Sequence, residues 1–237
     1  MPRQRFDAEL LDAPLSDLDL LAANFRDMAA VNRYLGGNMA ILRRVAHWIE
    51  ELPPKYVPTI LDIATGAADG PKVLTHWAAT HGRTVRMVAS DIEHNIIQLA
   101  SRTLRNAPVV LVQHDALAMP FADRAIDIVT CTLALHHFTH DAAVILLREM
   151  VRVARVGVIV SDLRRCWGGY WGARLLALGP FHELSKHDGP LSVLRAYTRD
   201  EAQALLQIAG IDGTAYAEPV FRLSLEIAEH TRVIEVK

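Results

Sequence analysis

The sequence predicts an α/β fold, because short apolar runs typical of buried strands alternate with segments whose apolar residues recur at helical spacing. Runs that end in an acid followed by small residues are typical of the edge of a parallel sheet where ligands bind. The candidate strands lie within 59–70 and at 83–90, 109–114, 125–133, 155–161, 214–220 and 222–229. We therefore expect a seven-stranded, mostly parallel sheet with helices on both faces.

The composition fits a single domain. A chain of 237 residues can bury one sizeable core, and its net charge of −2 predicts no broad basic surface for nucleic acid. Cys131 and Cys166 form neither a metal-binding spacing nor a disulfide framework, so we expect no metal site and reduced thiols. No apolar run is long enough to span a membrane and the N-terminus has no signal-peptide core, so we expect a cytoplasmic protein.

The most informative stretch is T-I-L-D-I-A-T-G-A-A-D-G at 59–70, which predicts a strand, a tight turn and the start of a helix. Ala64, Gly66, Ala68 and Gly70 place little or no side chain in this turn, so its backbone can come close to a bound cofactor. Such turns also occur in α/β proteins as plain architecture. The stretch alone leaves both interpretations open.

The acid in the turn separates two nucleotide-type cofactors. A dinucleotide fingerprint started at Ala64 has Gly66 in register but puts Asp69 in its last position, where the carboxylate would repel a pyrophosphate. S-adenosylmethionine has no phosphate and carries a sulfonium and an ammonium cation, so Asp62 and Asp69 are favourable neighbours for it. The turn therefore favours S-adenosylmethionine over NAD.

Acids follow the next candidate strands as well. Asp91 follows residues 83–90, and an acid there can accept hydrogen bonds from both hydroxyls of an adenosine ribose. Asp115 and Ala116 follow residues 109–114 and suit the amino group and a ring nitrogen of adenine. Alternatively, Asp91 could cap a helix and Asp115 could form a turn, and neither role excludes contact with a ligand.

Four segments in this order resemble the class I S-adenosylmethionine-dependent methyltransferases, and within them the branch of the ubiquinone/menaquinone methyltransferases. They are L-D-I-A-T-G-A-A-D-G, V-A-S-D, H-D-A-L-A-M-P-F-A-D with I-D-I-V, and L-A-L-H-H-F. Each is weak alone, whereas the ordered set, which spans roughly residues 32–210, is specific. The resemblance implies a Rossmann-like methyltransferase sheet with an antiparallel last strand, an N-terminal helical lid, and S-adenosyl-L-methionine as the cofactor.

The resemblance also implies which residues contact the cofactor. They are Asp62 for the ammonium group, Ala64, Thr65 and Gly66 for the methionine moiety, Asp91 for the ribose, Ile92, Asp115 and Ala116 for the adenine, and Thr132 and Leu133 beneath the transferred methyl group. Asp127 is assigned to structure, because the family's acid at this position lies at the far end of its strand. The family has glycines where this chain has Ala64 and Ala68, and an aromatic residue in place of Ile126, so we expect a shifted rather than an abolished site.

Parts that bind the substrate are expected on either side of the cofactor core. Residues 16–49 predict two helices broken at Gly36-Gly37, and residues 162–197 form a long insertion after the fifth strand. Both connect to the sheet edge where ligands bind, so we expect them to form a lid. We therefore divide a single domain, 1–237, into an N-terminal helical cap (1–58), a cofactor-binding core (59–161), a substrate-lid insertion (162–197) and a C-terminal helix and strand pair (198–237).

The predicted substrate-binding residues are Asn32, Tyr170, Trp171 and His182. Asn32 with Gly36-Gly37 matches an asparagine and glycine pair of the related quinone methyltransferases, and the other three belong to the insertion. Asn32 could instead be an exposed helix residue, and the aromatic residues of the insertion could form the core of the lid itself.

Two histidines after the fourth strand are candidate general bases. A methyltransferase mainly aligns the acceptor with the activated methyl group and needs at most to remove one proton. Histidine suits a phenolic or enolic proton near neutral pH, and His136 and His137 follow the strand where substrates of the family approach. We rank His137 before His136, although paired histidines could serve packing alone. Other candidates are His140, Asp162, Tyr170, His182 and His187.

The sequence disfavours some acceptors. The segment T-L-A-L-H-H-F lacks the Asp/Asn-Pro-Pro-aromatic signature that holds an exocyclic amine, and Cys131 lacks the preceding proline of pyrimidine-ring methylation. We expect a small hydrophobic hydroxylated acceptor, a phenol, quinol or polyketide-like molecule, methylated on oxygen by a monomer or homodimer with no nucleic-acid or membrane partner. A carbon methyltransferase of the same fold, an NAD-dependent reductase and a non-catalytic S-adenosylmethionine-binding module are the alternatives.

Overall fold

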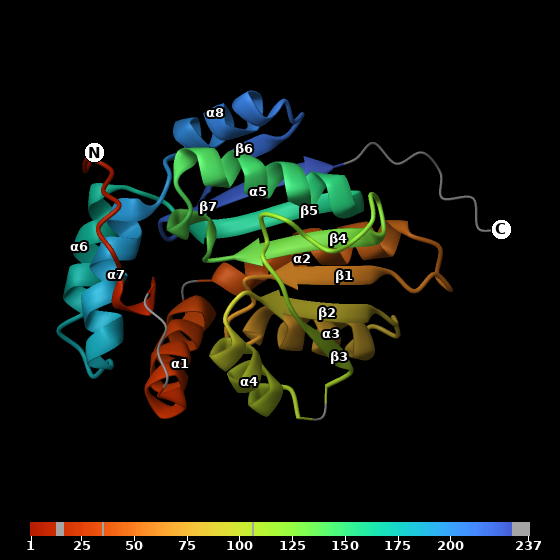
Figure 1. Ribbon diagram of the computed structural model, residues 1–237, viewed down its shortest axis with the longest axis horizontal. Helices are drawn as coiled ribbons and strands as arrows, with labels where there is room; N and C mark the ends of the chain where they lie inside the picture. The colour runs from red at the N-terminus through yellow and green to blue at the C-terminus, as the bar shows by residue number, and fades with distance from the viewer. Residues whose placement is uncertain (13–16, 35, 106, 229–237) are drawn as a thin grey trace.

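The structure, a computed structural model, describes residues 1–12, 17–34, 36–105 and 107–228. Its centre is the expected seven-stranded sheet, with the order β3-β2-β1-β4-β5-β7-β6 (Figure 1). Strands β1 to β5 run parallel, and β7 runs antiparallel to both of its neighbours. The strands are β1 (Thr59–Ile63), β2 (Arg86–Asp91), β3 (Val109–Gln113), β4 (Ile126–Thr132), β5 (Ala154–Leu163), β6 (Thr214–Glu218) and β7 (Arg222–Ala228).

Helices cover both faces of the sheet. They are α1 (Leu18–Tyr34), α2 (Gly37–Glu51), α3 (Asp69–Thr80), α4 (His94–Thr103), α5 (His140–Val153), α6 (Trp167–Leu176), α7 (Glu183–Arg195) and α8 (Arg199–Ala209), with short 3-10 turns η1 (Leu10–Asp12) and η2 (Leu135–His137). One buried cluster includes Leu147 of α5 and Leu206 of α8, and another includes Val45 of α2 and Leu74 of α3. None of the helices in the described ranges combines the length and apolar character needed to cross a membrane.

The predicted elements are confirmed, with shifts at their ends. The helix break lies at Gly36, and Gly37 already begins α2. Strand β2 begins at Arg86 and includes Asp91. Strand β5 runs on to Leu163, so Asp162 belongs to this strand and not to the insertion. Residue 16, where the predicted N-terminal helices begin, and residue 229, where the last predicted strand ends, lie outside the described residues.

The insertion folds into α6 and α7, which lie with α1 at the carboxyl edge of the parallel strands (Figure 1). The N-terminal segment runs along α7, where the Arg5 N–H donates to the carbonyl of Leu194 at 3.2 Å. The carboxylate of Asp188 accepts hydrogen bonds from the N–H groups of Leu10 and Leu11 at 2.9 and 3.1 Å. The beginning of the chain is thereby fixed beside the ligand edge of the sheet.

Candidate functional site

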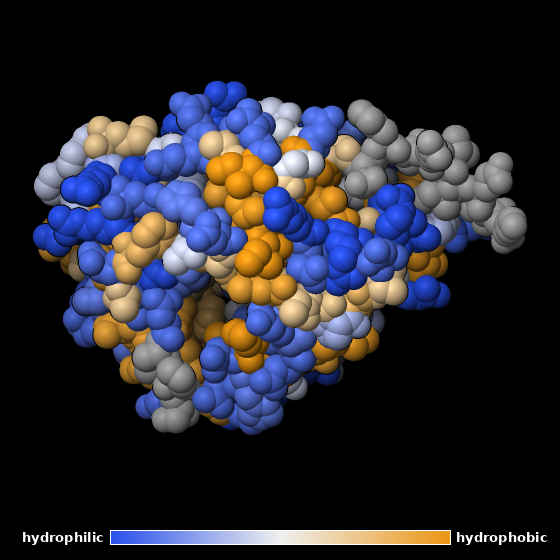
Figure 2. All heavy atoms as spheres, turned by 45° about the horizontal axis from the view of Figure 1, so that its top comes forward, coloured by the Kyte–Doolittle hydropathy of each residue, from blue (hydrophilic) through white to orange (hydrophobic). Residues whose placement is uncertain are grey.

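Two adjoining cavities lie at the carboxyl edge of the sheet. The turn cleft, of about 290 Å³, lies at the turn between β1 and α3, and the lid pocket, of about 390 Å³, is lined by α1, α6 and α7 among others. A hollow with apolar side chains inside it is visible in Figure 2. The residues that line both cavities are Leu11, Met28, Leu133 and His137. A ligand in one cavity can therefore meet a ligand in the other.

The turn between β1 and α3 has the backbone of a glycine-rich turn, although two of its positions are alanines. Ala64, Gly66 and Ala68 have φ angles of 48°, 56° and 63°. Residues other than glycine rarely adopt this left-handed region. Ala64 lines the cleft, whereas Ala68 is buried. The turn thus has a glycine-type geometry at the cost of some backbone strain.

Glycine is required at Gly66 by a close contact as well. A Cβ at this position would lie 2.6 Å from Cε1 of Phe25. Phe25 belongs to α1, is 8% exposed and also lines the turn cleft. The N-terminal helix therefore lies directly against the turn.

Asp62 is a buried carboxylate of the turn cleft. It accepts hydrogen bonds from the hydroxyls of Thr65 and Thr130 at 2.7 and 2.6 Å. Burial nevertheless raises the pKa of Asp62 to about 6. A cationic ligand group beside it would favour the charged form, because an opposite charge lowers the pKa of a carboxyl group.

Asp91 joins the end of β2 to the turn. Its two oxygens accept hydrogen bonds from the N–H groups of Gly66 and Glu93, each at 3.2 Å, and burial raises its pKa. The adjacent Ile92 is 56% exposed and lines the cleft. An apolar surface for a planar ring thus adjoins a carboxylate that can accept hydrogen bonds from hydroxyls.

The lining of the turn cleft is acidic. Its acids are Asp12, Asp62, Asp69, Asp91 and Glu93, and no lysine or arginine of the described chain lines it. This set of charges would repel a pyrophosphate and attract a cation. The cleft therefore fits the sulfonium and ammonium groups of S-adenosylmethionine better than a dinucleotide.

Thr132 and Leu133 line the turn cleft at the end of β4, where the resemblance implied them. Leu133 has a φ of 54°, a strained conformation for a leucine, and its side chain lies where the two cavities meet.

Asn32 also lines the cleft and is 7% exposed, so the alternative of an exposed helix residue is wrong.

Asp115 and Ala116 are not brought to the turn cleft. They follow β3, where the carboxylate of Asp115 accepts from the Leu117 N–H at 2.8 Å. Neither residue is among those that line the two cavities. Asp115 forms a turn, which was the alternative interpretation, and its contact with adenine stays a prediction.

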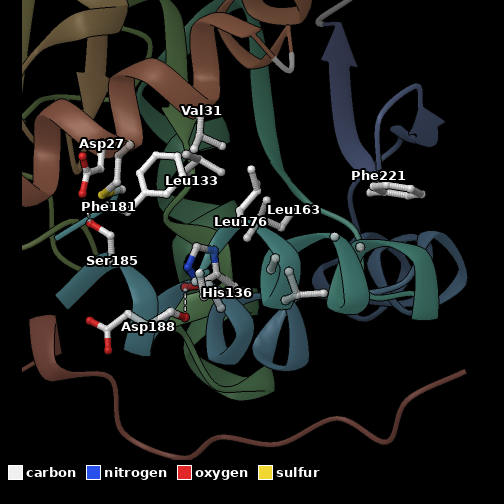
Figure 3. A pocket seen from close by; sticks show the side chains of 18 of the residues that line it. Asp27, Val31, Leu133, His136, Leu163, Leu176, Phe181, Ser185, Asp188 and Phe221 are labelled. Atoms are coloured by element: carbon white, nitrogen blue, oxygen red, sulfur yellow. Dashed lines mark hydrogen bonds between the residues drawn. The ribbon is translucent and has the colours of Figure 1, made fainter. Parts of the chain in front are cut away.

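Apolar side chains of the lid pocket surround the imidazole ring of His136. Figure 3 shows Val31, Leu133, Leu176 and Phe181 around His136. These four apolar side chains come from α1, the end of β4, α6 and the segment before α7. A cavity of this size and character suits a small hydrophobic ligand.

His136 is held by Asp162. The ring is 3% exposed, its Nδ1 lies 2.7 Å from Oδ1 of Asp162, and the His136 backbone N–H donates to Oδ2 at 2.8 Å. Although burial opposes it, the charge and hydrogen bonds of His136 hold the pKa of Asp162 below its usual value. Because the carboxylate accepts the proton of Nδ1, the neutral ring keeps Nε2 free to accept a proton.

Glu9 approaches the same ring from the N-terminal segment. Its Oε1 lies 3.9 Å from Nε2 of His136 and 3.6 Å from Nε of Arg195, and accepts no hydrogen bond within the described residues. Burial raises the pKa of Glu9 to about 7, against the attraction of the charges of His137 and Arg195. Glu9 is therefore a group in the pocket that can change its protonation near neutral pH.

His137 is oriented by a different carboxylate. Its Nδ1 lies 2.9 Å from Oδ1 of Asp12, and the Arg195 guanidinium binds the other oxygen of Asp12. Arg195 also donates to the backbone carbonyls of His136 and His137, each at 3.2 Å. One arginine of α7 thus holds the short turn that carries both histidines.

Glu9, His136 and His137 each have a potential ligand atom within 4.8 Å of the others, so they could hold a metal ion. The guanidinium of Arg195 already lies 3.6 Å from Glu9, and its charge would oppose a second cation there. The expectation of no metal therefore stays our prediction.

Tyr170, Trp171 and His182 are not brought into the lid pocket. None of them lines it, Trp171 is 61% exposed, and the His182 side chain caps α7 by accepting from the Leu184 N–H. The part of α6 that lines the pocket consists of Gly169, Gly172, Ala173, Leu175 and Leu176. The structure corrects the expectation for Tyr170 and Trp171, because α6 turns its small and aliphatic residues toward the cavity, whereas Phe181 of the same insertion does line it.

Apart from Asp162, the charged residues around the histidines and in the lid pocket were missed from the sequence. Glu9, Asp12, Arg195 and Arg222 come from distant segments of the chain and belong to no local motif. The only available signal was a group of acids ahead of the first helix, which fits a solvated segment equally well.

The chain is similar in sequence to known methyltransferases. Residues 60–157 match a family described as a methyltransferase domain. The chain is 28% identical over 178 residues to the ubiquinone/menaquinone biosynthesis C-methyltransferase UbiE of Enterobacter sp. (strain 638), and 31% identical over 176 residues to that of Escherichia coli O139:H28. Each match covers 67% of this chain and 68% of the relative. The demethylmenaquinone methyltransferase of Roseiflexus sp. (strain RS-1) is 37% identical over 103 residues, 44% of this chain and 41% of the relative.

Solved structures share the fold at low identity. A S-adenosylmethionine-dependent methyltransferase from Aquifex aeolicus matches with a TM-score of 0.62 and 15% identity, over 90% of this chain and 98% of the other. The plantazolicin methyltransferase BpumL, solved with a triazolic desmethyl-plantazolicin analogue and S-adenosylhomocysteine, matches with a TM-score of 0.67 and 12% identity, over 90% of each chain.

Proposed function

The chain belongs to the class I S-adenosylmethionine-dependent methyltransferases, in the branch of the ubiquinone/menaquinone biosynthesis C-methyltransferases, and on this basis we propose that it methylates a small hydrophobic acceptor with a hydroxyl group. It is an enzyme, and S-adenosylmethionine is its cofactor. The alternatives of an NAD-dependent reductase and a non-catalytic binding module are thereby set aside. A phenol, a quinol or a polyketide-like hydroxyl compound is the proposed acceptor.

The acidic turn cleft supports the assignment of residues to the cofactor. Asp62 would bind the ammonium group, Asp91 the ribose hydroxyls, and Ile92 the adenine ring. When bound, S-adenosylmethionine supplies a methyl group that its sulfonium has already activated. The residues of the lid pocket then have to orient the acceptor, keep water away and accept its proton.

The single observation that carries the proposal is the His136–Asp162 pair in the apolar lid pocket, beside the junction with the turn cleft. Nε2 of His136 would accept the proton of the acceptor hydroxyl, and Asp162 would stabilise the imidazolium that results. This geometry favours His136 over His137, the reverse of the ranking from sequence. His137, which lines both cavities, is the second candidate.

Removal of this proton is compatible with two methylation sites. The deprotonated oxygen is the direct nucleophile, so we propose oxygen as the first methylation site. Charge from a phenolate also spreads to ring carbons, and the related enzymes are named C-methyltransferases. Methylation of a ring carbon is therefore the second candidate.

The test uses the purified protein, S-adenosylmethionine with a ¹³C-labelled methyl group, and a panel of phenols, hydroquinones and hydroxynaphthoquinones. We expect acceptor-dependent formation of S-adenosylhomocysteine, and the ¹³C shift of the product separates a methyl group on oxygen from one on carbon. His136→Ala is the negative control. Methylation of amines or thiols, with no hydroxylated compound turned over, would contradict the proposal.

A further inference from the structure

Arg222 is a buried cation in the wall of the lid pocket. It begins β7, is 2% exposed and lines the pocket. Its Nη2 donates to Oδ1 of Asn32, whereas its Nε and Nη1 have no hydrogen-bond partner in the described part of the chain. Buried guanidinium donors without an acceptor are costly, because the water that they lose is not replaced.

No carboxylate of the described residues forms an ion pair with Arg222. Asp162 is near enough to attract it, but the Asp162 oxygens already accept hydrogen bonds from η2 and from the backbone of β5. Asp27 and Asp188, which also line the pocket, accept hydrogen bonds from α7 and from the N-terminal segment respectively. Arg222 is the one arginine or lysine among the described lining residues of this pocket.

The fold keeps the guanidinium in this place. A Cβ on Gly37 would lie 2.8 Å from Cζ of Arg222, so the first residue of α2 leaves the room that the guanidinium occupies. The N-terminus of α2 has no side-chain cap, and its dipole adds positive potential at the same point. On the other side, Arg222 is paired with Leu163 in the ladder between β7 and β5. Two sources of positive potential thus meet at one point in an apolar pocket.

We propose that Arg222 binds an anionic oxygen of the methyl acceptor. The acceptor is then a hydroxyaryl acid, in which the ring system that bears the hydroxyl also bears a carboxylate. This inference rests on the proposed function, because it assumes that the lid pocket holds the acceptor. An anionic oxygen supplies the unpaired N–H groups with a charge-assisted acceptor. With the hydroxyl at His136 and the carboxylate at Arg222, two polar groups of one apolar pocket fix the orientation of the ring.

The test measures binding rather than turnover. Protein saturated with S-adenosylhomocysteine is titrated in a calorimeter with 3-hydroxybenzoate and 3-hydroxy-2-naphthoate, each compared with its carboxamide. We expect the wild type to bind at least one acid tenfold or more tightly than its amide. Arg222→Met should abolish this preference and keep the affinity for the amide, and Arg222→Lys should keep part of the preference.

Arg174→Met is the matched control, because Arg174 is an exposed cation on α6 that does not line the pocket. It should retain the full preference for the acid. Thermal unfolding and S-adenosylhomocysteine affinity show whether each variant is folded. Absence of any preference in the wild type, or a preference that survives in folded Arg222→Met, overturns the inference.

A second arm tests whether the carboxylate comes from the cofactor instead. S-adenosylhomocysteine has an amino-acid carboxylate, and 5′-methylthioadenosine lacks it. If Arg222→Met weakens the binding of S-adenosylhomocysteine tenfold or more and leaves the binding of 5′-methylthioadenosine unchanged, Arg222 binds the cofactor and the inference is wrong. Binding of acids through Arg222 without methylation of any hydroxyl compound would support the inference and contradict the proposed function, so the two can fail separately.

Discussion

Nδ1 of His136 and Oδ1 of Asp162 lie 2.7 Å apart, although the two residues are 26 positions apart in the sequence. His136 lies in η2, the turn that follows β4, and Asp162 lies in β5. The neighbouring strands β4 and β5 pair in parallel as far as Thr132 and Ser161. The extra residues at the end of β5 carry the carboxylate up to the turn that follows β4. The pair is therefore a consequence of the sheet register.

Asp162→Asn should lower kcat by about a hundredfold or more, because an amide can donate to Nδ1 and leave the proton on Nε2, where it blocks general-base catalysis. The affinity for S-adenosylhomocysteine, measured by calorimetry, should change little. His137→Ala is the comparison and should cost less turnover than His136→Ala. If His137→Ala has the larger effect, the original ranking of the two histidines was right.

Asp91→Ala should weaken the binding of S-adenosylhomocysteine by about 2 to 4 kcal/mol, because charge-assisted hydrogen bonds to the ribose are lost. Asp127 is the matched carboxylate at the opposite end of the sheet, where it accepts from the Tyr56 hydroxyl at 2.9 Å and the Thr59 N–H at 2.8 Å. Asp127→Ala should lower Tm instead and leave the affinity of the folded protein unchanged. Equal losses of affinity in the two variants would contradict the assignment of Asp91 to the ribose.

Ala64→Gly and Gly66→Ala should have opposite effects on stability. The first relieves an alanine at a φ of 48° and should change the free energy of unfolding by up to about 1 kcal/mol in the stabilising direction. The second puts a methyl group 2.6 Å from Phe25 at a φ of 56° and should destabilise by more than that. Urea unfolding of both variants checks the signs, and stabilisation by Gly66→Ala would be incompatible with the turn described.

Glu9→Gln should make stability less dependent on pH. The pKa of Glu9 rises from 4.5 to about 7 on folding, so between these values the folded protein holds a proton that the unfolded chain releases. Wild-type stability should therefore fall as pH rises through this window, by up to about 3 kcal/mol at about 1.4 kcal/mol per pKa unit. Asp62 shifts in the same direction, so the informative quantity is the wild-type stability minus that of Glu9→Gln. This difference should fall between about pH 4.5 and pH 7, and a constant difference would show that Glu9 is not perturbed.

The strands and the cofactor turn could be predicted because their signals are local. The run at 59–70 contains both the buried strand and the small residues of the turn, and the acids Asp62 and Asp91 lie at the carboxyl ends of β1 and β2. Asp91 and Ile92 could be named for the same reason, because consecutive residues at a strand end share one edge of the sheet. Asp115 was placed by the same rule, but its own turn keeps it from the cleft.

The lid pocket could not be predicted in detail, because long-range packing decides which face of each lid helix points inward. The tryptophans and tyrosine of α6 suggest a substrate-binding surface in the sequence, but the side of this helix that carries its glycines and alanine lines the cavity. Glu9 and Arg222 have no local pattern, and only the fold brings them to the pocket. Charges that meet from distant segments leave no spacing in the sequence to detect.

The hydrogen bond between Arg222 and Asn32 joins residues 190 positions apart, and so dictates when the pocket can form during folding. Strand β7 inserts between β5 and β6, so the sheet is also incomplete until the last described strand has paired. Contacts at such separation form late, because the entropy of closing a long loop must be offset before they stabilise the chain. A nascent chain could fold its cofactor turn while still being synthesised, yet it could complete the wall of its acceptor pocket only after β7 had left the ribosome.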